Sequence, residues 1–322
     1  MITHFGINSR DHILVFQDFL LKSLVSNQAP VFDRRMSTEN LGKNLSAFIC
    51  EKNNKKLLVI IDADDGCGGT PSDCKIVWQT LVEIQRLYRP DDMMILKSQV
   101  NSDPEYNQFY PFKEDVYPIG IFSNDPRKIF VIKNFLEKKE KDIDVFFAGG
   151  LKHINKRPYA WPKNRDIRKW WCGAATRGYE KLLELKDKRP DIKFALFDDT
   201  LPENKFYDLL NRSKICPDLP GGMSSRKFYE CLVLGKCVVS IKQQLTSWTC
   251  IENVHYSSIG EDLDFSTLES KIDHLLKDDN YKKIENNVNE IFNELTLESI
   301  VLKAKNAIID KIDNINECKI QY

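Results

Sequence analysis

Residues 213–241 read SKICPDLPGGMSSRKFYECLVLGKCVVSI, and this stretch decides the fold that we expect. Ser213–Pro217 has the composition of the end of a short buried strand, and the loop Pro220-Gly221-Gly222 then breaks regular structure. Cys237–Ile241 is apolar and rich in β-branched residues, which predicts a second buried strand. The residues between the loop and the second strand have helical spacing. The stretch therefore predicts a strand, a loop, a helix and a parallel strand.

The predicted helix carries a signal for each of its ends. Ser224 or Ser225 offers the side-chain oxygen of an N-cap, and the helix is expected to run to about Leu234. Gly235 follows as the residue that ends it, since glycine adopts the left-handed backbone of a helix C-terminus without strain. A strand–helix–strand unit of this kind places a helix N-terminus at the carboxyl edge of a parallel sheet, where phosphates are usually bound.

Two charged side chains on this helix indicate what the edge binds. Arg226 lies in the first turn, where a cation is unfavourable next to the helix dipole unless an anion is near. Glu230 lies on a flank of the apolar stripe, where a carboxylate can accept hydrogen bonds from ribose hydroxyls. The alternative is an ordinary amphipathic helix in which Glu230 pairs with Lys227 in solvent, and the spacing alone leaves both open. The apolar stripe consists of Phe228, Cys231, Leu232 and Gly235.

The same stretch resembles the nucleotide-sugar site of GT-B glycosyltransferases, and most closely that of the exostosin-like group. That group has a small-residue loop, a Ser-Arg pair, a helix with a Glu four residues after the Arg, a Gly and a Val-rich strand. In this chain these positions are Ser224, Ser225, Arg226, Glu230, Gly235, Val238 and Val239. The exostosin helix commonly has a Pro and smaller residues beside the Arg, whereas this chain has Lys227-Phe228-Tyr229. Looser agreement extends over residues 140–260.

The resemblance implies a fold and a donor site. The fold is α/β of the GT-B type, with two Rossmann-like domains that face a cleft and C-terminal helices that cross back to the first domain. Arg226 is implied to contact the diphosphate of a nucleotide sugar and Glu230 to hold its ribose, with Ser224 and Ser225 in the loop before them. The donor is a substrate, and no further cofactor is expected.

A second loop is expected to complete the donor site. It begins with Gly149 and Gly150, which resemble the GT-B loop that lets the backbone approach the diphosphate and the sugar. It continues with basic residues, of which Arg157 and Lys152 are the favoured partners of the leaving diphosphate; the alternative is a lysine-rich loop in solvent. Because such enzymes generally neutralise the diphosphate with side chains and helix dipoles, no metal site is predicted. A uracil-type base is expected beside Phe197–Pro202.

The first domain is expected to bind the acceptor. An inverting transfer needs a base that removes the proton of the acceptor hydroxyl, and a carboxylate at the end of a buried strand suits this role. The strand Leu57–Asp62 leads into Asp62, Asp64 and Asp65. We favour Asp65 as the base and Asp62 as a structural cap; the alternative is that all three end the strand and cap the next helix. Lys97, at the end of another short strand, is expected to line the same cleft.

The domain boundaries follow from a charged run and from the helical tail. We expect an N-terminal acceptor domain over residues 1–138 and a nucleotide-sugar domain over residues 139–296. The first domain is expected to be completed by a C-terminal helix within 297–322, for which Thr296 is a candidate cap. Near the N-terminus, Ile13–Phe16 is predicted as a strand that runs into a helix.

Composition narrows the class of protein. The chain has 322 residues with 47 Lys and Arg and 47 Asp and Glu, so it has no overall basic field for nucleic acid. We expect no transmembrane segment, because no apolar run is long enough. The nine cysteines form no framework, which favours a reducing, cytoplasmic location. The sequence does not indicate the oligomeric state.

The favoured function is that of a glycosyltransferase, either a hexosyl- or a pentosyltransferase. It would move a sugar from a nucleotide diphosphate, with UDP favoured, to a carbohydrate hydroxyl, with inversion and without a metal. Two alternatives stay open. The cluster of Asp62, Asp64 and Asp65 is compatible with a metal-dependent GT-A-like transferase or phosphatase, and the 213–241 unit with a non-catalytic nucleotide-binding module.

Overall fold

The structure is a computed structural model of the whole chain, and it describes twelve stretches of it. These are residues 2–7, 11–24, 31–32, 45–62, 82–97, 116–118, 132–133, 139–149, 167–219, 226–241, 250–260 and 265–315. The fold is α/β, as the sequence predicts, with one sheet in each of two compact units. Within the described stretches, no helix is both long and apolar enough to cross a membrane.

The two units share the chain unevenly. The first comprises Met1–Pro126, Leu245–Trp248 and Glu294–Tyr322, and the second comprises Arg127–Gln244 and Thr249–Asn293. The first boundary therefore precedes the expected position at residues 138 and 139. Two contacts tie residues 132–133 to the second unit, because Lys133 donates a 3.2 Å hydrogen bond to Asn289 and lies 3.5 Å from the ring centroid of Phe292.

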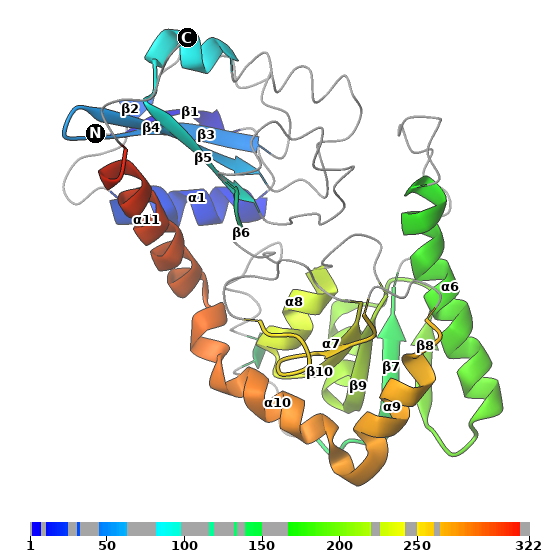
Figure 1. The fold of residues 1–322 in the computed structure, drawn as a ribbon. Helices are drawn as coiled ribbons and strands as arrows, with labels where there is room; N and C mark the ends of the chain where they lie inside the picture. The colour runs from blue at the N-terminus through cyan, green and yellow to red at the C-terminus, as the bar shows by residue number, and fades with distance from the viewer. Residues whose placement is uncertain are drawn as a thin grey trace. The chain divides into compact units, whose positions relative to one another are not determined.

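The first unit contains a six-stranded mixed sheet (Figure 1). Its strand order is β2-β1-β3-β4-β5-β6, and all neighbours are parallel except those of β3, which is antiparallel to β1 and β4. A Rossmann-like sheet thus carries one reversed strand. The strands are β1 (Ile2–Ile7), β2 (Val31–Phe32), β3 (Leu45–Lys52), β4 (Lys55–Asp62), β5 (Asp92–Lys97) and β6 (Val116–Pro118).

The reversal of β3 depends on a two-residue turn into β4. Asn53 and Asn54 have φ values of 52° and 61°, the positive values that a type I′ hairpin turn requires at both central residues. Asparagine tolerates this backbone better than most residues other than glycine. The strand Leu57–Asp62 was expected here, and the turn explains why β3 is antiparallel to it.

In the part of the first unit that the structure describes, the sheet is accompanied by helix α1 (Asp11–Leu24), helix α11 (Leu297–Asp313) and a helical stretch at residues 82–88. Residues 13–16 lie inside helix α1 (Asp11–Leu24), so the predicted strand Ile13–Phe16 is wrong. Its apolar residues belong to a helical pattern in which Phe16, Leu20 and Leu21 are buried. Helix α11 (Leu297–Asp313) contacts α1, β4 and β5.

Helix α11 begins as the sequence predicts. The amide of Ser299 donates a 3.1 Å hydrogen bond to the hydroxyl oxygen of Thr296, which is therefore the N-cap. The helix buries one stripe against the first unit, composed of Leu297, Ile300, Val301, Ala304, Ile308 and Ile312. A short 3₁₀ helix, η4 (Phe292–Leu295), precedes the cap.

The second unit is built on a five-stranded parallel sheet with the order β11-β10-β9-β7-β8. Numbered within the unit, this is the doubly wound order 2-1-3-4-5. The strands are β7 (Ile143–Ala148), β8 (Phe194–Phe197), β9 (Ser213–Asp218), β10 (Cys237–Ser240) and β11 (Ser257–Ser258). The helices are α6 (Ile167–Lys188), α7 (Glu203–Asn211), α8 (Arg226–Val233), α9 (Leu268–Leu276) and α10 (Tyr281–Glu290), with the 3₁₀ helix η3 (Lys277–Asp279) between the last two.

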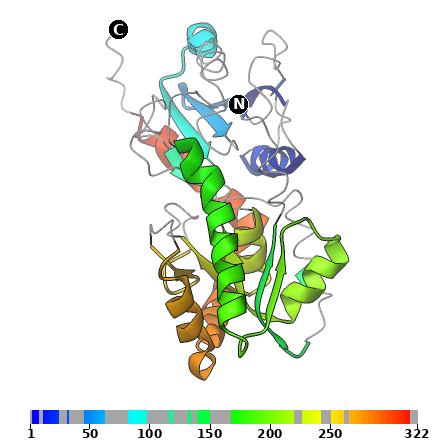
Figure 2. The ribbon, with the colours of Figure 1, turned by 90° about the vertical axis from the view of Figure 1, so that its right-hand side faces the viewer.

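Helices α6 and α7 cover opposite faces of this sheet. Phe146 packs against Phe206 of α7, with ring centroids 5.6 Å apart, and Phe147 packs against Tyr179 of α6 at 5.4 Å. Because successive side chains of a strand point to opposite faces, these two contacts lie on different sides of β7. Figure 2 shows α6 as the long helix along one face.

Helix α8 ends in a Schellman motif. The amide of Gly235 donates to the carbonyl of Leu232 at 2.8 Å, and the amide of Lys236 donates to that of Cys231 at 2.9 Å. Gly235 has a φ of 69°, so it is the C-terminal glycine that the sequence predicts. A Cβ atom at this position would lie 2.6 Å from Oδ1 of Asn289 on α10, so the Asn289 side chain would have to move.

We predict that Gly235→Ala lowers the free energy of unfolding by about 2–4 kcal/mol, the sum of left-handed backbone strain and the clash with Asn289. Gly260→Ala is the matched control, since its φ is 72° and nothing lies within 4 Å of the added Cβ. That variant should lose only the strain, about 1–2 kcal/mol. Urea denaturation measures both, and equal losses would contradict the role of Asn289.

Lys133 should give the stability a specific pH dependence. Burial, followed by the nearby charge of Lys236, lowers the pKa of Lys133 to about 8. Between this value and its ordinary pKa of 10.5 the unfolded chain holds more protons at this site than the folded chain, so this residue makes the unfolding free energy rise with pH. Subtracting the unfolding free energies of Lys133→Met from those of the wild type should isolate this rise between pH 8 and 10.5. A difference that does not change with pH would contradict it.

Candidate functional site

The topological switch point of the second sheet lies between β7 and β9. These strands are neighbours, yet the chain leaves β7 through α6 toward β8 and leaves β9 through α8 toward β10, on the other side. In doubly wound sheets, ligands bind in the crevice outside the carboxyl ends of the two strands where this divergence occurs. The strand order therefore selects Ala148-Gly149 and Asp218-Leu219 as the floor of a binding site.

Gly149 is the first residue beyond β7. Its amide donates a 3.2 Å hydrogen bond to the carbonyl of Phe197, which extends the pairing of β7 with β8. A Cβ atom on Gly149 would lie 2.9 Å from Cζ of Phe147, so a larger residue would displace that ring. Close approach of the backbone to a ligand was expected at this position. Packing against Phe147 is a second reason for a glycine here.

Asp218 is the last residue of β9 and is 2% exposed. The hydroxyl of Ser240, in the neighbouring strand β10, lies 3.4 Å from a carboxylate oxygen of Asp218 and 3.3 Å from its carbonyl oxygen. This residue was not among the predicted site residues. Its signal is an acidic residue at the end of a buried strand, immediately before the loop that contains Pro220-Gly221-Gly222.

From Phe228 onward, helix α8 is buried on all its sides. Each residue from Phe228 to Leu234 is at most 7% exposed, and the ring of Phe228 lies against that of Tyr256 at 5.2 Å. The predicted single apolar stripe is therefore too narrow, because the residues outside it are as buried as those within it, namely Tyr229, Glu230, Val233 and Leu234. A helix this enclosed is part of the core rather than a surface layer.

The burial of α8 decides between the two interpretations of Glu230. Glu230 is 5% exposed, so the alternative in which it pairs with Lys227 in solvent is wrong. Lys227 turns away from it and donates a 2.9 Å hydrogen bond to the carbonyl of Pro217 in β9. A carboxylate is costly to bury, and its presence one turn inside this helix marks it as a residue with a specific partner.

Lys227 is the second residue that the sequence analysis did not assign to the site. Its Nζ lies 4.1 Å from the ring centroid of Phe147 and 5.9 Å from that of Phe146, both near the end of β7. Burial lowers the pKa of its ammonium group, while Cys231 and Asp218 act in the opposite direction. Its signal in the sequence is the departure from the smaller residues of exostosin-like chains at this position.

Several predicted site residues lie outside what the structure describes. Gly150, Arg157, Ser224 and Ser225 are among them, as are Lys152 and the aspartates Asp64 and Asp65. For Arg226 and Asp62 the structure describes the backbone only. Arg226 is the first residue of α8, so its expected position in the first turn is confirmed.

The carboxyl edge of the first sheet carries Asp62 and Lys97. These residues end β4 and β5 and are paired in register in the parallel ladder, and Lys97 is in turn paired with Pro118 of β6. The expectation that both follow buried strands to one edge is confirmed for the backbone. Among the described residues, no group of three or more His, Cys, Asp or Glu side chains is arranged to hold a metal ion.

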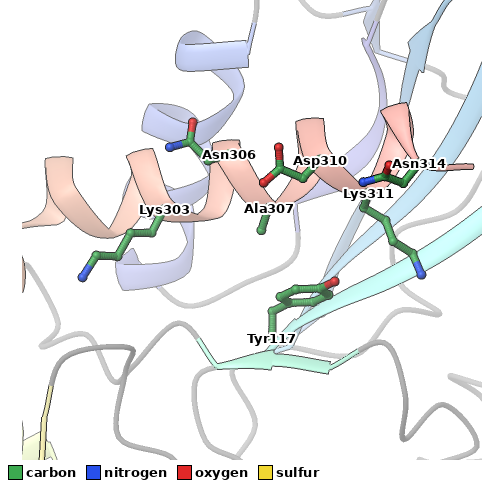
Figure 3. Close-up of a pocket in the computed structure, with 7 residues that line it drawn as sticks. All are labelled: Tyr117, Lys303, Asn306, Ala307, Asp310, Lys311 and Asn314. Atoms are coloured by element: carbon green, nitrogen blue, oxygen red, sulfur yellow. The ribbon is translucent and has the colours of Figure 1, made fainter.

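A cavity of about 630 Å³ lies in the first unit beside α11 (Figure 3). Tyr117 of β6 faces Ala307 across it, and Lys303 and Lys311 extend on either side (Figure 3). Both cations have acidic partners, since Lys311 lies 3.0 Å from Asp92 and Lys303 lies 3.0 Å from Glu294. The other described lining residues are Asn306, Asp310 and Asn314.

Comparison with known proteins gives only distant similarity. No protein-family model and no curated protein sequence matches the chain. Among solved structures, HepE of Anabaena in complex with UDP is similar with 12% identity and a TM-score of 0.40, over 74% of this chain and 68% of that one.

Two further solved structures are similar at the same level. Sucrose-phosphate synthase from Thermosynechococcus elongatus has 12% identity and a TM-score of 0.37, over 75% of this chain and 62% of its own. The pneumococcal O-GlcNAc transferase GtfA in complex with UDP and GlcNAc has 10% identity and a TM-score of 0.37, over 84% and 71%. At these scores we draw no conclusion about this chain from any of the three.

Proposed function

We propose that this protein is a glycosyltransferase of the GT-B type whose second unit binds a nucleoside diphosphate sugar, UDP-sugar being favoured. The observation that carries the proposal is a buried carboxylate, Glu230, one turn inside the helix that follows the switch point of a 2-1-3-4-5 parallel sheet. The strand order supports a ligand at this edge, and the helix that begins there supports an anionic one.

The proposed partner of Glu230 is the ribose of the donor. Glu230 lies four residues beyond Arg226, so its Cα is about 6 Å further along the helix axis. This offset matches a nucleotide whose diphosphate lies at the start of the helix. The two oxygens of a buried carboxylate can accept hydrogen bonds from both hydroxyls of a ribose, and charge-assisted bonds of this kind are strong.

The proposed partner of Arg226 is the diphosphate. A cation in the first turn of a helix opposes the dipole unless an anion compensates it, and a bound diphosphate would do so. The backbone at Gly149 and Gly150 is proposed to approach the same phosphates from the end of β7. Ser224, Ser225 and Arg157 are proposed to complete the site from the adjoining loops.

The first unit is proposed to hold a carbohydrate acceptor. In an inverting reaction the acceptor oxygen attacks the anomeric carbon, and the bond to the leaving phosphate oxygen breaks with its electron pair left on that oxygen. The acceptor proton passes to a base, for which Asp65 is proposed, with Asp62 and Asp64 beside it at the end of β4. We propose that the reaction needs no metal. The return of α11 to the first unit is in keeping with the GT-B type.

We predict that the purified protein binds UDP in EDTA, and that Glu230→Gln and Arg226→Met each weaken binding roughly 10-fold or more, as the loss of a charged hydrogen bond implies. Isothermal titration calorimetry with UDP, GDP and TDP measures this. Glu184→Gln is the control, because Glu184 pairs with Lys181 on the exposed side of α6 and should change nothing.

The outcomes separate this proposal from its rivals. Binding of no nucleotide, or binding only with added Mn²⁺, would contradict it and favour the aspartate cluster at the end of β4. Tight UDP binding without hydrolysis of any UDP-sugar and without transfer to any carbohydrate would favour a non-catalytic binding module.

A further inference from the structure

Lys227 joins the ends of the two strands that form the switch point. Its ammonium donates a 2.9 Å hydrogen bond to the carbonyl of Pro217, the penultimate residue of β9. The same ammonium lies 4.1 Å from the ring centroid of Phe147, the penultimate residue of β7. The positive charge is therefore held between the carboxyl ends of β7 and β9, at the floor of the proposed donor site.

This charge is less well compensated than those of comparable lysines. Lys214 lies 2.7 Å from Asp144, Lys141 pairs with Glu285, and Lys311 in the cavity of the first unit lies 3.0 Å from Asp92. Among the described residues, no carboxylate lies within 4 Å of the Lys227 ammonium.

Within the described stretches, the partners of this ammonium are one carbonyl and the rings of Phe147 and Phe146. An ammonium has three donors, and the Pro217 carbonyl accepts only one hydrogen bond from it. The residue as a whole is partly exposed. The lowered pKa that accompanies its burial agrees with a charge that lacks a strong partner. An anion at the switch point would supply one.

We propose that the ammonium of Lys227 is the subsite for the terminal phosphate of a nucleoside diphosphate. The inference rests on the proposed function, and it names the residue that would bind the terminal one of the two phosphates. Glu230, proposed to hold the ribose, lies three residues further along α8, where side chains are neighbours on a helix surface. The phosphate nearest the strand ends is then the one distal to the ribose, and its oxygen is the one that leaves the sugar.

The experiment compares uridine, UMP and UDP on the same variants by calorimetry. In the wild type, the second phosphate should strengthen binding. Lys227→Met should weaken UDP binding about 10-fold or more and change UMP and uridine binding less than 2-fold, so the preference for UDP over UMP collapses. Lys227→Arg should retain most of this preference, because it keeps the charge.

Two controls separate binding from structure. Lys227→Gln keeps a donor for the Pro217 carbonyl without the charge, so it should lose the preference even if Lys227→Met is poorly folded. Lys236→Met is the matched lysine, since Lys236 is 7% exposed, lies 3.3 Å from the carbonyl oxygen of Asn211 and follows the other end of α8. It should lower stability and leave the preference unchanged.

The results distinguish the inference from the function on which it rests. Equal weakening of UMP and UDP in Lys227→Gln, or an unchanged preference, would overturn the phosphate subsite while leaving UDP binding by the wild type intact. If the wild type bound neither nucleotide, the proposed function would fail first, and the subsite with it.

Discussion

The enclosure of α8 is the constraint on which the second unit depends. From Phe228 to Leu234 every residue is buried, although the helix directly follows the loop that contains Pro220-Gly221-Gly222 and carries a glutamate in its middle. A core helix of this kind must end sharply, and Gly235 ends it against Asn289 of α10. The fold thus fixes the helix at one end by packing and directs its other end to the carboxyl edge of the sheet.

The same enclosure gives the site its chemistry. A carboxylate and an ammonium within one helical turn are normally found on the surface, where they pair with each other in water. Here Glu230 is enclosed and Lys227 turns back to the end of β9. Exceptions to the rules of a stable core are expected where function requires them. Both exceptions lie on α8, next to the crevice that the strand order selects.

The sequence predicted the parts of the fold that depend on local physics. The β-branched run after Gly235, the glycine itself and the Thr296 cap each act within a few residues, and all three were found where expected. The strand–helix–strand unit around Gly235 followed from those signals, whereas the two Rossmann-like domains were implied by the resemblance.

The rest depends on contacts that no local pattern contains. The side of α8 that its own sequence assigns to solvent is buried at Tyr229, Glu230 and Val233, and this reversed the simplest interpretation of Glu230. The turn of Lys227 toward Pro217 likewise requires the end of β9 to lie beside the start of α8. The apolar residues of Ile13–Phe16 suit either a strand or a helix. The structure has a helix here, and it buries Phe16 and Leu20.

Hydrogen exchange of the intact protein with and without saturating UDP tests the central claim most directly. A nucleotide bound at the switch point should slow exchange in peptides that cover the ends of β7 and β9 and the first turn of α8. Peptides from the opposite ends of the same strands should be unaffected. Protection confined to the first unit, or no change at saturation, would contradict the account.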